Sequence, residues 1–142
     1  MTGSDVRLAL VHRLRQAVDD HDLDAVVDCF TPEYRNETPA HPGRGFEGRE
    51  QVRENWQRIF TGVGDISAEV LRTAVEGEVI WSEWEMRGTR PDGQPHLMRG
   101  VIIFGVPGER AAWARFYLEP VDPGEGGVRA VISKIVDAEP PQ

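Results

Sequence analysis

The sequence predicts an α+β fold in which N-terminal helices pack in the concave face of a curved antiparallel or mixed β-sheet. Residues 6–30 and 49–60 carry apolar side chains at the three- and four-residue spacing of amphipathic helices. Residues 79–119 instead form three runs that alternate between two faces, separated by Gly- and Pro-containing segments at 90–95 and 105–110. Because the helices come first and the strands after them, the layout is that of an α+β fold with helices covering one face of the sheet.

Length and composition are those of a globular protein. The chain has 142 residues, of which 39% are hydrophobic and 28% are charged, and the length suits one domain. A formal net charge of -8 with a single lysine, Lys134, argues against a nucleic-acid partner, because phosphates are bound by clustered Lys and Arg. No apolar run approaches the roughly 20 residues of a membrane span, so no membrane association is expected.

The cellular location follows from the cysteine content and the first residues. Cys29 is the single cysteine and cannot form an internal disulfide. The first residues lack the basic start and apolar centre of a secretory signal. We therefore expect a cytoplasmic protein.

Three helices are expected before the main sheet. Residues 6–20 place six apolar side chains at helical spacing, and residues 23–30 form a shorter helix that begins after Asp22 and ends at Pro32. Residues 49–60 have an apolar stripe opposite a charged face and are followed by two glycines.

An extended segment and a loop separate the second and third helices. In residues 33–38 the alternate side chains of Tyr34, Asn36 and Thr38 share one face. Residues 40–48 contain prolines and glycines that break both regular patterns, so they are expected to form a loop at the rim of the fold.

Residues 66–75 are predicted to form a strand, and residues 79–119 a three-stranded antiparallel meander. Alternation sorts the meander into two faces, and we place Trp81, Glu83 and Glu85 on the concave one. The concave face is then completed by apolar residues of the next two strands: Met98, Ile102, Phe104, Ala114, Phe116 and Leu118.

The opposite face of the meander is also too apolar to be left in water. Its aromatic residues with arginines at the edge are typical of a protein interface, which predicts a homodimer through this outer sheet face. The residues assigned to it are Ile80, Ser82, Trp84, Met86, Arg99, Val101, Ile103, Trp113, Arg115, Tyr117 and Glu119.

The domain is expected to span residues 1–120, with residues 121–142 as a Gly- and Pro-rich C-terminal extension. Residues 128–136 have the pattern of a short helix that presses Val131, Ile132 and Ile135 against the body. The outer sheet face is therefore expected to be covered either by a second copy of the chain or by residues 128–136 of the same chain.

Two carboxylates on an apolar face are the strongest chemical signal in the chain. Glu83 and Glu85 are two residues apart on one strand, about 7 Å from each other, and two carboxyl groups in a dry pocket separate their pKa values into an acid and a base. Tyr34 and Asn36 would then orient a substrate or water. The alternative is that both glutamates pair with arginines such as Arg87 and Arg99, or face solvent through a register shift.

The concave face would bind a hydrophobic small molecule. Trp56 and Trp81 are expected to stack on it, although tryptophan at such positions also serves as core packing. His41, in the rim loop, is either a proton shuttle or simply exposed. The complete substrate-binding set is Trp56, Trp81, Met98, Ile102, Phe116, Leu118 and His41. The histidines are isolated, so no metal site is expected. No phosphate-binding glycine loop is found, so no nucleotide cofactor is expected either.

Three segments carry a resemblance to a known family. They are residues 45–52 (GFEGREQV), 98–104 (MRGVIIF) and 115–120 (RFYLEP). Over about residues 6–120 the chain resembles the SnoaL-like branch of the nuclear transport factor two-like superfamily, which includes ketosteroid isomerase-like and limonene epoxide hydrolase-like proteins. The resemblance implies a cone-like α+β barrel, a small-molecule pocket inside it, and a dimer through the outer sheet face.

The resemblance gives no counterpart here for the catalytic acidic residues of two related enzyme classes. The general base of ketosteroid isomerases would fall on Thr38, and their protonated aspartate near Ile102. The acidic residue of SnoaL-type polyketide cyclases would fall close to Phe116. The resemblance therefore implies that neither kind of acid/base group is present.

Limonene epoxide hydrolases match better. Their tyrosine and asparagine, two residues apart, correspond to Tyr34 and Asn36. The rest of their catalytic set, Asp, Arg and Asp, would fall on Glu85, Glu83 and Phe116, so one carboxylate is retained and the arginine and second aspartate are not.

Together these features predict a small, cofactor-independent acid/base enzyme of the cyclase, isomerase or hydrolase type acting on a hydrophobic small molecule. Two alternatives stay open from sequence alone. One is a non-catalytic small-molecule-binding protein, and the other is a dimerising accessory to a larger enzyme.

Overall fold

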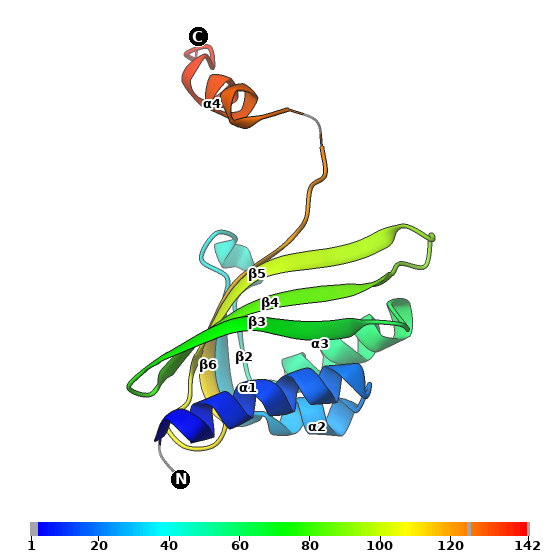
Figure 1. Cartoon of the computed structure of the whole chain (residues 1–142), viewed down its shortest axis with the longest axis vertical. Coiled ribbons are helices and arrows are strands. Elements are labelled where there is room, and N and C mark those ends of the chain that lie inside the picture. Colours follow the sequence, from blue (N-terminus) through cyan, green and yellow to red (C-terminus); the bar gives the residue numbers. More distant parts are fainter. Residues whose placement is uncertain (1–2, 125, 142) are drawn as a thin grey trace.

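The computed structural model describes residues 3–124 and 126–141. Three of its helices line one side of a curved sheet, and the C-terminal helix stands away from it (Figure 1). The helices are α1 (Gly3–Asp19), α2 (Leu23–Asp28), the 3-10 turn η1 (Pro42–Arg44), α3 (Arg49–Gly62) and α4 (Val128–Val136). The strands are β1 (Phe30–Glu37), β2 (Phe46–Glu47), β3 (Ser67–Glu76), β4 (Val79–Thr89), β5 (Pro95–Gly105) and β6 (Ala111–Pro120).

The six strands form one sheet in the order β2-β1-β6-β5-β4-β3. Every neighbouring pair is antiparallel except β1 and β6, which run parallel, so the sheet is mixed. It curves strongly without closing into a barrel (Figure 1). The predicted α+β fold class is confirmed.

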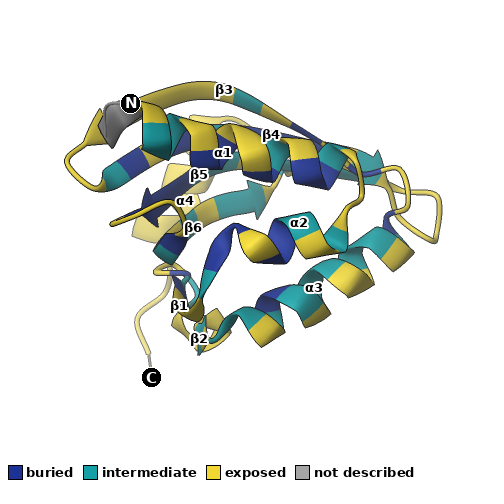
Figure 2. Cartoon of the chain, turned by 90° about the horizontal axis from the view of Figure 1, so that it is seen from below, coloured by how far each residue is buried: buried dark blue, intermediate teal, exposed yellow. Residues whose placement is uncertain are grey.

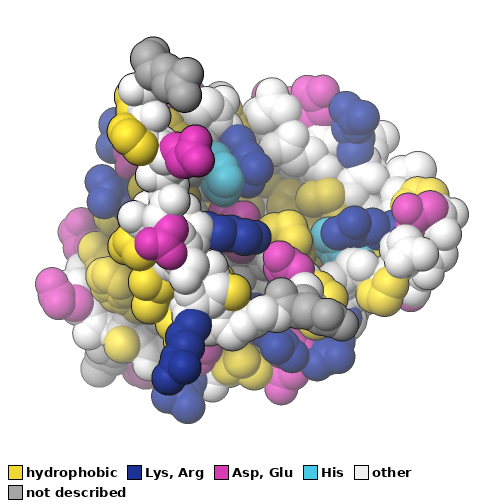
Figure 3. Space-filling view, turned by 90° about the horizontal axis from the view of Figure 1, so that it is seen from above, with side chains coloured by type: hydrophobic (Ala, Val, Ile, Leu, Met, Phe, Trp, Pro, Cys, Tyr) yellow, Lys and Arg dark blue, Asp and Glu magenta, His cyan; other side chains and the backbone are white. Residues whose placement is uncertain are grey.

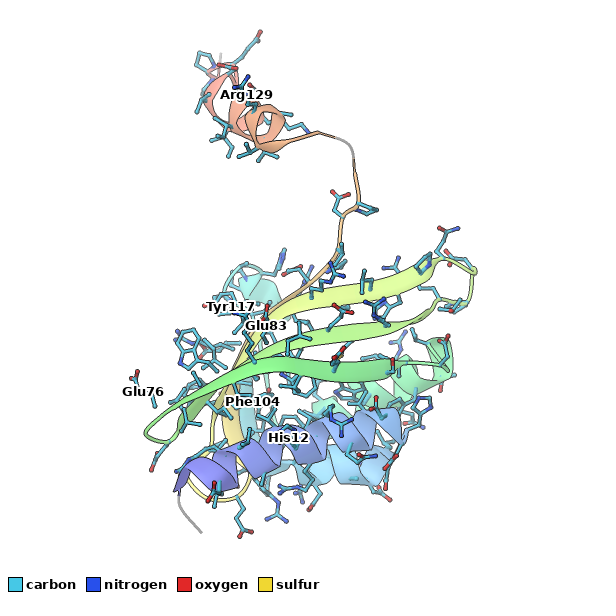
Figure 4. The ribbon with its side chains drawn as sticks, viewed as in Figure 1. His12, Glu76, Glu83, Phe104, Tyr117 and Arg129 are labelled. Carbon is cyan, nitrogen blue, oxygen red and sulfur yellow. The ribbon has the colours of Figure 1, made fainter. Side chains whose placement is uncertain are left out.

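The core lies between the concave sheet face and the helices. The buried stripe of α1 includes Leu10, Val11 and Val18, which have no exposed surface, and it packs against the sheet through β3 and β4. Phe104 is also fully buried and lies between sheet and helices (Figure 4). Figure 2 shows the same pattern, with the buried residues of α1 and α2 turned toward the sheet.

The orientation predicted for β4 is wrong. Ile80, Ser82, Trp84 and Met86 face the core, and Trp84 has no exposed surface. Ser82 pairs with Ile102 across the β4–β5 ladder, and directly paired residues share a face. Residues 81, 83 and 85 therefore lie on the outer face, and the strand is turned over relative to the prediction.

The concave residues predicted for β5 and β6 are placed correctly. Ile102 pairs with Phe116, and Phe104 pairs with Ala114. Gly100 lies in the middle of β5 with a φ of +149°, and a Cβ there would collide with the backbone carbonyl of Tyr117. Glycine is therefore required where β5 comes so close to β6.

The C-terminal helix α4 stands apart from the body on an extended segment (Figure 1). Val131, Ile132 and Ile135 are 56%, 49% and 72% exposed, so the prediction that they press against the body is wrong. The residues between Pro120 and α4 include a proline and three glycines, which do not hold the helix in place. Of the helices described, none has the length and apolarity that crossing a membrane would require.

Candidate functional site

A cavity of about 340 Å³ opens between the concave sheet face and helix α3. This volume lies within the range of small-molecule sites. Most of its wall is apolar or aromatic and comes from both the sheet and α3. The apolar lining residues are Phe30, Phe46, Val52, Trp56, Ile59, Val63, Ile66, Met86, Met98, Phe116 and Leu118.

A polar cluster from β1 lies in the same wall. Tyr34 and Asn36 are 1% and 8% exposed, and Thr38 follows them on the same face. The Tyr34 hydroxyl donates a hydrogen bond of 2.8 Å to Oδ1 of Asn36. Burial raises the pKa of Tyr34 well above its ordinary value, so the hydroxyl keeps its proton and remains a donor.

The Tyr34 bond leaves the Asn36 amide nitrogen available to a ligand, because the oxygen is already occupied. Asn55 on α3 is held in a similar way, since its Oδ1 accepts a hydrogen bond of 2.8 Å from Nε2 of Gln51. The cavity wall thus presents two amide groups whose N–H donors have no partner among the described side chains.

His96 lines the cavity from the start of β5. Partial burial lowers its pKa below the ordinary value of 6.5, and the positive charge of Arg90 lowers it further. The imidazole is therefore neutral at pH 7, in the form that accepts a proton. Among the described residues, the other titratable groups of the wall are Arg44 and Tyr34, and the raised pKa of Tyr34 keeps its hydroxyl neutral.

The structure brings six of the predicted site residues into this wall: Tyr34, Asn36, Trp56, Met98, Phe116 and Leu118. Ile102 lies deeper, in the core, and is 1% exposed. Trp81 does not reach the cavity: it is 49% exposed on the outer face because β4 is turned over. His41 is in the rim loop, as predicted, but its Nε2 lies 3.0 Å from Oε1 of Glu119 instead of lining the cavity.

Glu83 and Glu85 do not face the cavity, so the geometric argument for a carboxylate pair inside it is wrong. Glu83 lies 3.7 Å from Arg72, and its side chain is 44% exposed. Glu85 is bound by Arg99 at 2.9 Å and by Arg87. The arginine pairing considered as the alternative is what the structure shows.

Glu85 is the best-paired carboxylate of the outer face. Hydrogen bonds from Arg99 and Arg87 lower its pKa below the ordinary value of 4.5. When folding lowers the pKa of a carboxyl group, the charged group stabilises the folded state at pH values above its pKa in the unfolded chain. This stabilisation is lost as the pH falls through the pKa of the folded state.

We therefore expect Glu85→Gln to melt at a lower temperature than the wild type at pH 7, with the difference shrinking as the pH falls below about 4.5. Thermal melts from pH 7 to pH 3 measure this, and Glu83→Gln, which loses a long and exposed ion pair, is the matched control with little change. Equal melting temperatures of wild type and Glu85→Gln at pH 7 would contradict the expectation.

Sequence reasoning missed three polar residues of the wall: Arg44, Asn55 and His96. A signal for His96 was available, because it precedes Met98 by two residues and strand alternation gives both the same face. Arg44 comes from the 3-10 turn η1, which the residue pattern did not predict. Asn55 lies three residues after Val52 and four before Ile59, so helical spacing places it on the same side of α3, and this signal was available.

No three His, Cys, Asp or Glu side chains come together within residues 3–124 and 126–141. Thr38 offers an oxygen atom to the cavity, the amide oxygens of Asn36 and Asn55 already accept hydrogen bonds, and none of the described residues of the wall is a carboxylate. Neutral oxygens alone are a weak set of ligands for a divalent cation.

Several solved structures have the same fold. The epoxide hydrolase/cyclase-like enzyme SalBIII, from pyran ring formation in polyether salinomycin, is 20% identical, with 85% of this chain and 95% of that chain covered and a TM-score of 0.72. An NTF2-like protein from Anabaena variabilis is 17% identical. The alignment covers 87% of this chain and 96% of that protein, with a TM-score of 0.70.

A protein from Catenulispora acidiphila with a ketosteroid isomerase-like fold, solved in complex with trimethylamine, is 15% identical, with 76% and 84% covered and a TM-score of 0.67. At these identities the similarity establishes the fold and nothing more. No curated protein matches the chain.

The family is established at the level of sequence. The model of the SnoaL-like domain matches residues 11–116, which include the second half of α1, all of α2 and α3, and the sheet except the end of β6. The predicted resemblance is therefore confirmed, and the chain belongs to the SnoaL-like domain family.

Proposed function

We propose that the chain is a small, cofactor-independent enzyme that binds a mainly apolar molecule in its cavity and transfers a proton on it, with His96 as the acid/base group. The observation that carries this proposal is the position of His96. It is the one side chain among the described cavity residues that exchanges a proton near neutral pH. The cyclase-like relative SalBIII supports a reaction of the cyclase type.

The wall is suited to removal of a proton from a carbon next to a carbonyl group. The neutral imidazole of His96 accepts the proton, and the C–H electron pair moves to form an enolate with its charge on the former carbonyl oxygen. The amide N–H groups of Asn36 and Asn55 are donors that would stabilise this oxygen. Such an enolate can then attack a second carbonyl carbon, close a ring or take its proton back at another position.

Deuterium exchange tests the proposal without knowledge of the natural substrate. In D₂O at pH 7.5, 2-acetylnaphthalene is expected to take up deuterium at its methyl carbon faster with the protein than with the same concentration of free imidazole. Mass spectrometry measures the uptake. Exchange no faster than with imidazole, despite demonstrated binding of the ketone, would contradict catalysis.

A second candidate is a binding protein without chemistry. It is favoured by one observation: none of the described cavity residues is Asp or Glu, and carboxylates are the commonest strong bases in such apolar sites. The exchange experiment separates the two candidates, because a binding protein retains the ketone with its hydrogens unexchanged.

We also propose that the outer sheet face forms a homodimer. Trp81 and Tyr117 are 49% and 41% exposed along a groove that also contains Ile103 and Trp113. Charges of both signs, Arg35, Arg115, Glu37 and Glu76, border the groove. A face with apolar centre and mixed charge at its edge can match a second copy of itself around a two-fold axis.

Size-exclusion chromatography with light scattering measures the molar mass in solution and so tests the dimer. The wild type is expected at twice the chain mass of 15.9 kDa, and Trp81→Glu at 15.9 kDa. Ile135→Glu on the exposed α4 is the matched control and should remain dimeric. If Ile135→Glu dissociates and Trp81→Glu does not, α4 is the interface and the sheet face is not.

A further inference from the structure

The cavity differs from the rest of the molecule in its charge. The chain contains 24 Asp and Glu residues among 142, yet none of the described residues in the cavity wall is acidic. Acidic and basic side chains are interspersed on the surface seen in Figure 3. A wall that excludes one sign of charge within an acidic protein indicates a ligand that is not a cation.

Arg44 is the permanent cation of this wall. Most arginines of the body have a carboxylate partner: Arg99 binds Glu85 at 2.9 Å, and Arg110 binds Asp28 at 2.9 Å. Arg44 has no such partner among the described residues. Its guanidinium is therefore available to an acceptor from outside the chain.

The backbone of Arg44 is held in place at the rim. Its N–H donates to the carbonyl of His41 at 2.9 Å, and the His41 N–H donates to the carbonyl of Thr38 at 2.8 Å. The His41 side chain lies 3.0 Å from Glu119 of β6, which connects the rim loop to the sheet. The turn thus presents Arg44 beside the cavity in a defined position, which lowers the entropy cost of binding.

The other polar groups of the wall are also suited to an acceptor. Asn36 and Asn55 have their amide oxygens occupied by Tyr34 and Gln51, which leaves their N–H groups for a ligand. In the proposed function these N–H groups bind the carbonyl oxygen of the ligand, so the guanidinium of Arg44 is left for a second acceptor. A carboxylate, with two oxygens and a negative charge, accepts from a guanidinium most strongly.

We propose that the ligand of the cavity is an apolar, predominantly aromatic molecule that carries a carboxylate, with Arg44 binding that carboxylate at the rim. The inference rests on the proposed function, because it assumes that the cavity binds a small molecule. The aromatic wall residues Phe46, Trp56 and Phe116 contact the apolar part, and Arg44 selects the charge.

Three compounds of similar shape and different charge test the preference for a carboxylate: 2-naphthoate, 2-naphthamide and 2-naphthylmethylammonium. Titration calorimetry of the full chain at pH 7.5 is expected to show 2-naphthoate binding roughly ten-fold more tightly than the amide, since a hydrogen bond to a charged group contributes about that much. The ammonium compound is expected to bind most weakly.

Arg44→Gln should reduce affinity for 2-naphthoate to that for 2-naphthamide, which itself should change little. Arg44→Lys keeps the charge without the planar pair of donors and should restore part of the difference. Arg58→Gln is the control, because Arg58 is exposed on α3 and does not line the cavity.

Equal affinity of the wild type for the acid and the amide overturns the carboxylate assignment while leaving the proposed function intact. An undiminished preference in Arg44→Gln overturns the role of Arg44. Failure of all three compounds to bind overturns the proposed small-molecule site itself, and this inference with it.

Discussion

Replacement of His96 by glutamine is expected to slow deuterium exchange into 2-acetylnaphthalene by about 10² to 10⁴-fold, the usual contribution of a general base. Glutamine has a similar size and remains a hydrogen-bonding group, but it cannot accept a proton near neutral pH. The side chain lies at the cavity and is only partly buried, so the free energy of unfolding should change little.

The pH dependence of the same reaction gives an independent test. The base acts in its neutral form, and the pKa of His96 is lowered from 6.5 by burial and by Arg90. Exchange should therefore rise with pH through a value below 6.5 and be level between about pH 7 and 8. Arg90→Gln should move this rise toward higher pH, because it removes a positive charge that disfavours the imidazolium.

Glu83→Gln is the control for catalysis, since Glu83 lies on the outer face and pairs with Arg72. The Glu83→Gln variant should catalyse deuterium exchange into 2-acetylnaphthalene at the wild-type rate. The opposite result, loss of exchange in Glu83→Gln with full exchange in His96→Gln, would refute the assignment and return the acid/base role to the glutamates.

The largest effect on stability is expected at Trp84. The indole is fully buried, and its Nε1 donates at 2.8 Å to Oγ of Ser82, which donates at 2.6 Å to the carbonyl of Ile102. Trp84→Ala removes most of this packing and should lower the free energy of unfolding by about 3 to 5 kcal/mol. Urea unfolding, followed by circular dichroism, measures the loss.

Trp81→Ala provides the matched control, because it changes the same residue type on the same strand but on the opposite face. Trp81 is 49% exposed, and its replacement should cost less than about 1 kcal/mol at concentrations where the protein is monomeric. A larger loss for Trp81→Ala than for Trp84→Ala would mean that β4 has the orientation expected from sequence and not the one in the structure.

The elements of this fold were predictable because each depends on local patterns. The helical spacing of residues 6–20 and 49–60 corresponds to α1 and α3, and the alternation of residues 79–119 corresponds to β4, β5 and β6. Tyr34, Asn36 and Thr38 share a face because they alternate on one strand, and that face lines the cavity. None of these inferences needed knowledge of a partner strand.

The face of β4 was not predictable from alternation alone, because both of its faces carry tryptophan. Burial offered a better guide: one choice places Ser82 in the core, and the other places two carboxylates among apolar side chains at much greater cost. Glu85 is only 8% exposed on the outer face, but there Arg87 and Arg99 pair with it. The same alternation that places Met98 in the cavity wall also places His96 there, because the two residues are two positions apart on β5.

The order of residues along the chain by itself determined the type and approximate limits of the main helices and strands, since spacing and turn residues act over a few positions. It did not determine η1 and β2, which lie where only a loop was expected. The family was indicated by the resemblance of three segments and is shown by the family match. Only the tertiary structure decided which face of β4 is inside and which distant side chains meet. A shift of one residue between paired strands exchanges their faces, and the contacts of Arg44, Asn55 and His96 with one cavity join segments that no local pattern connects.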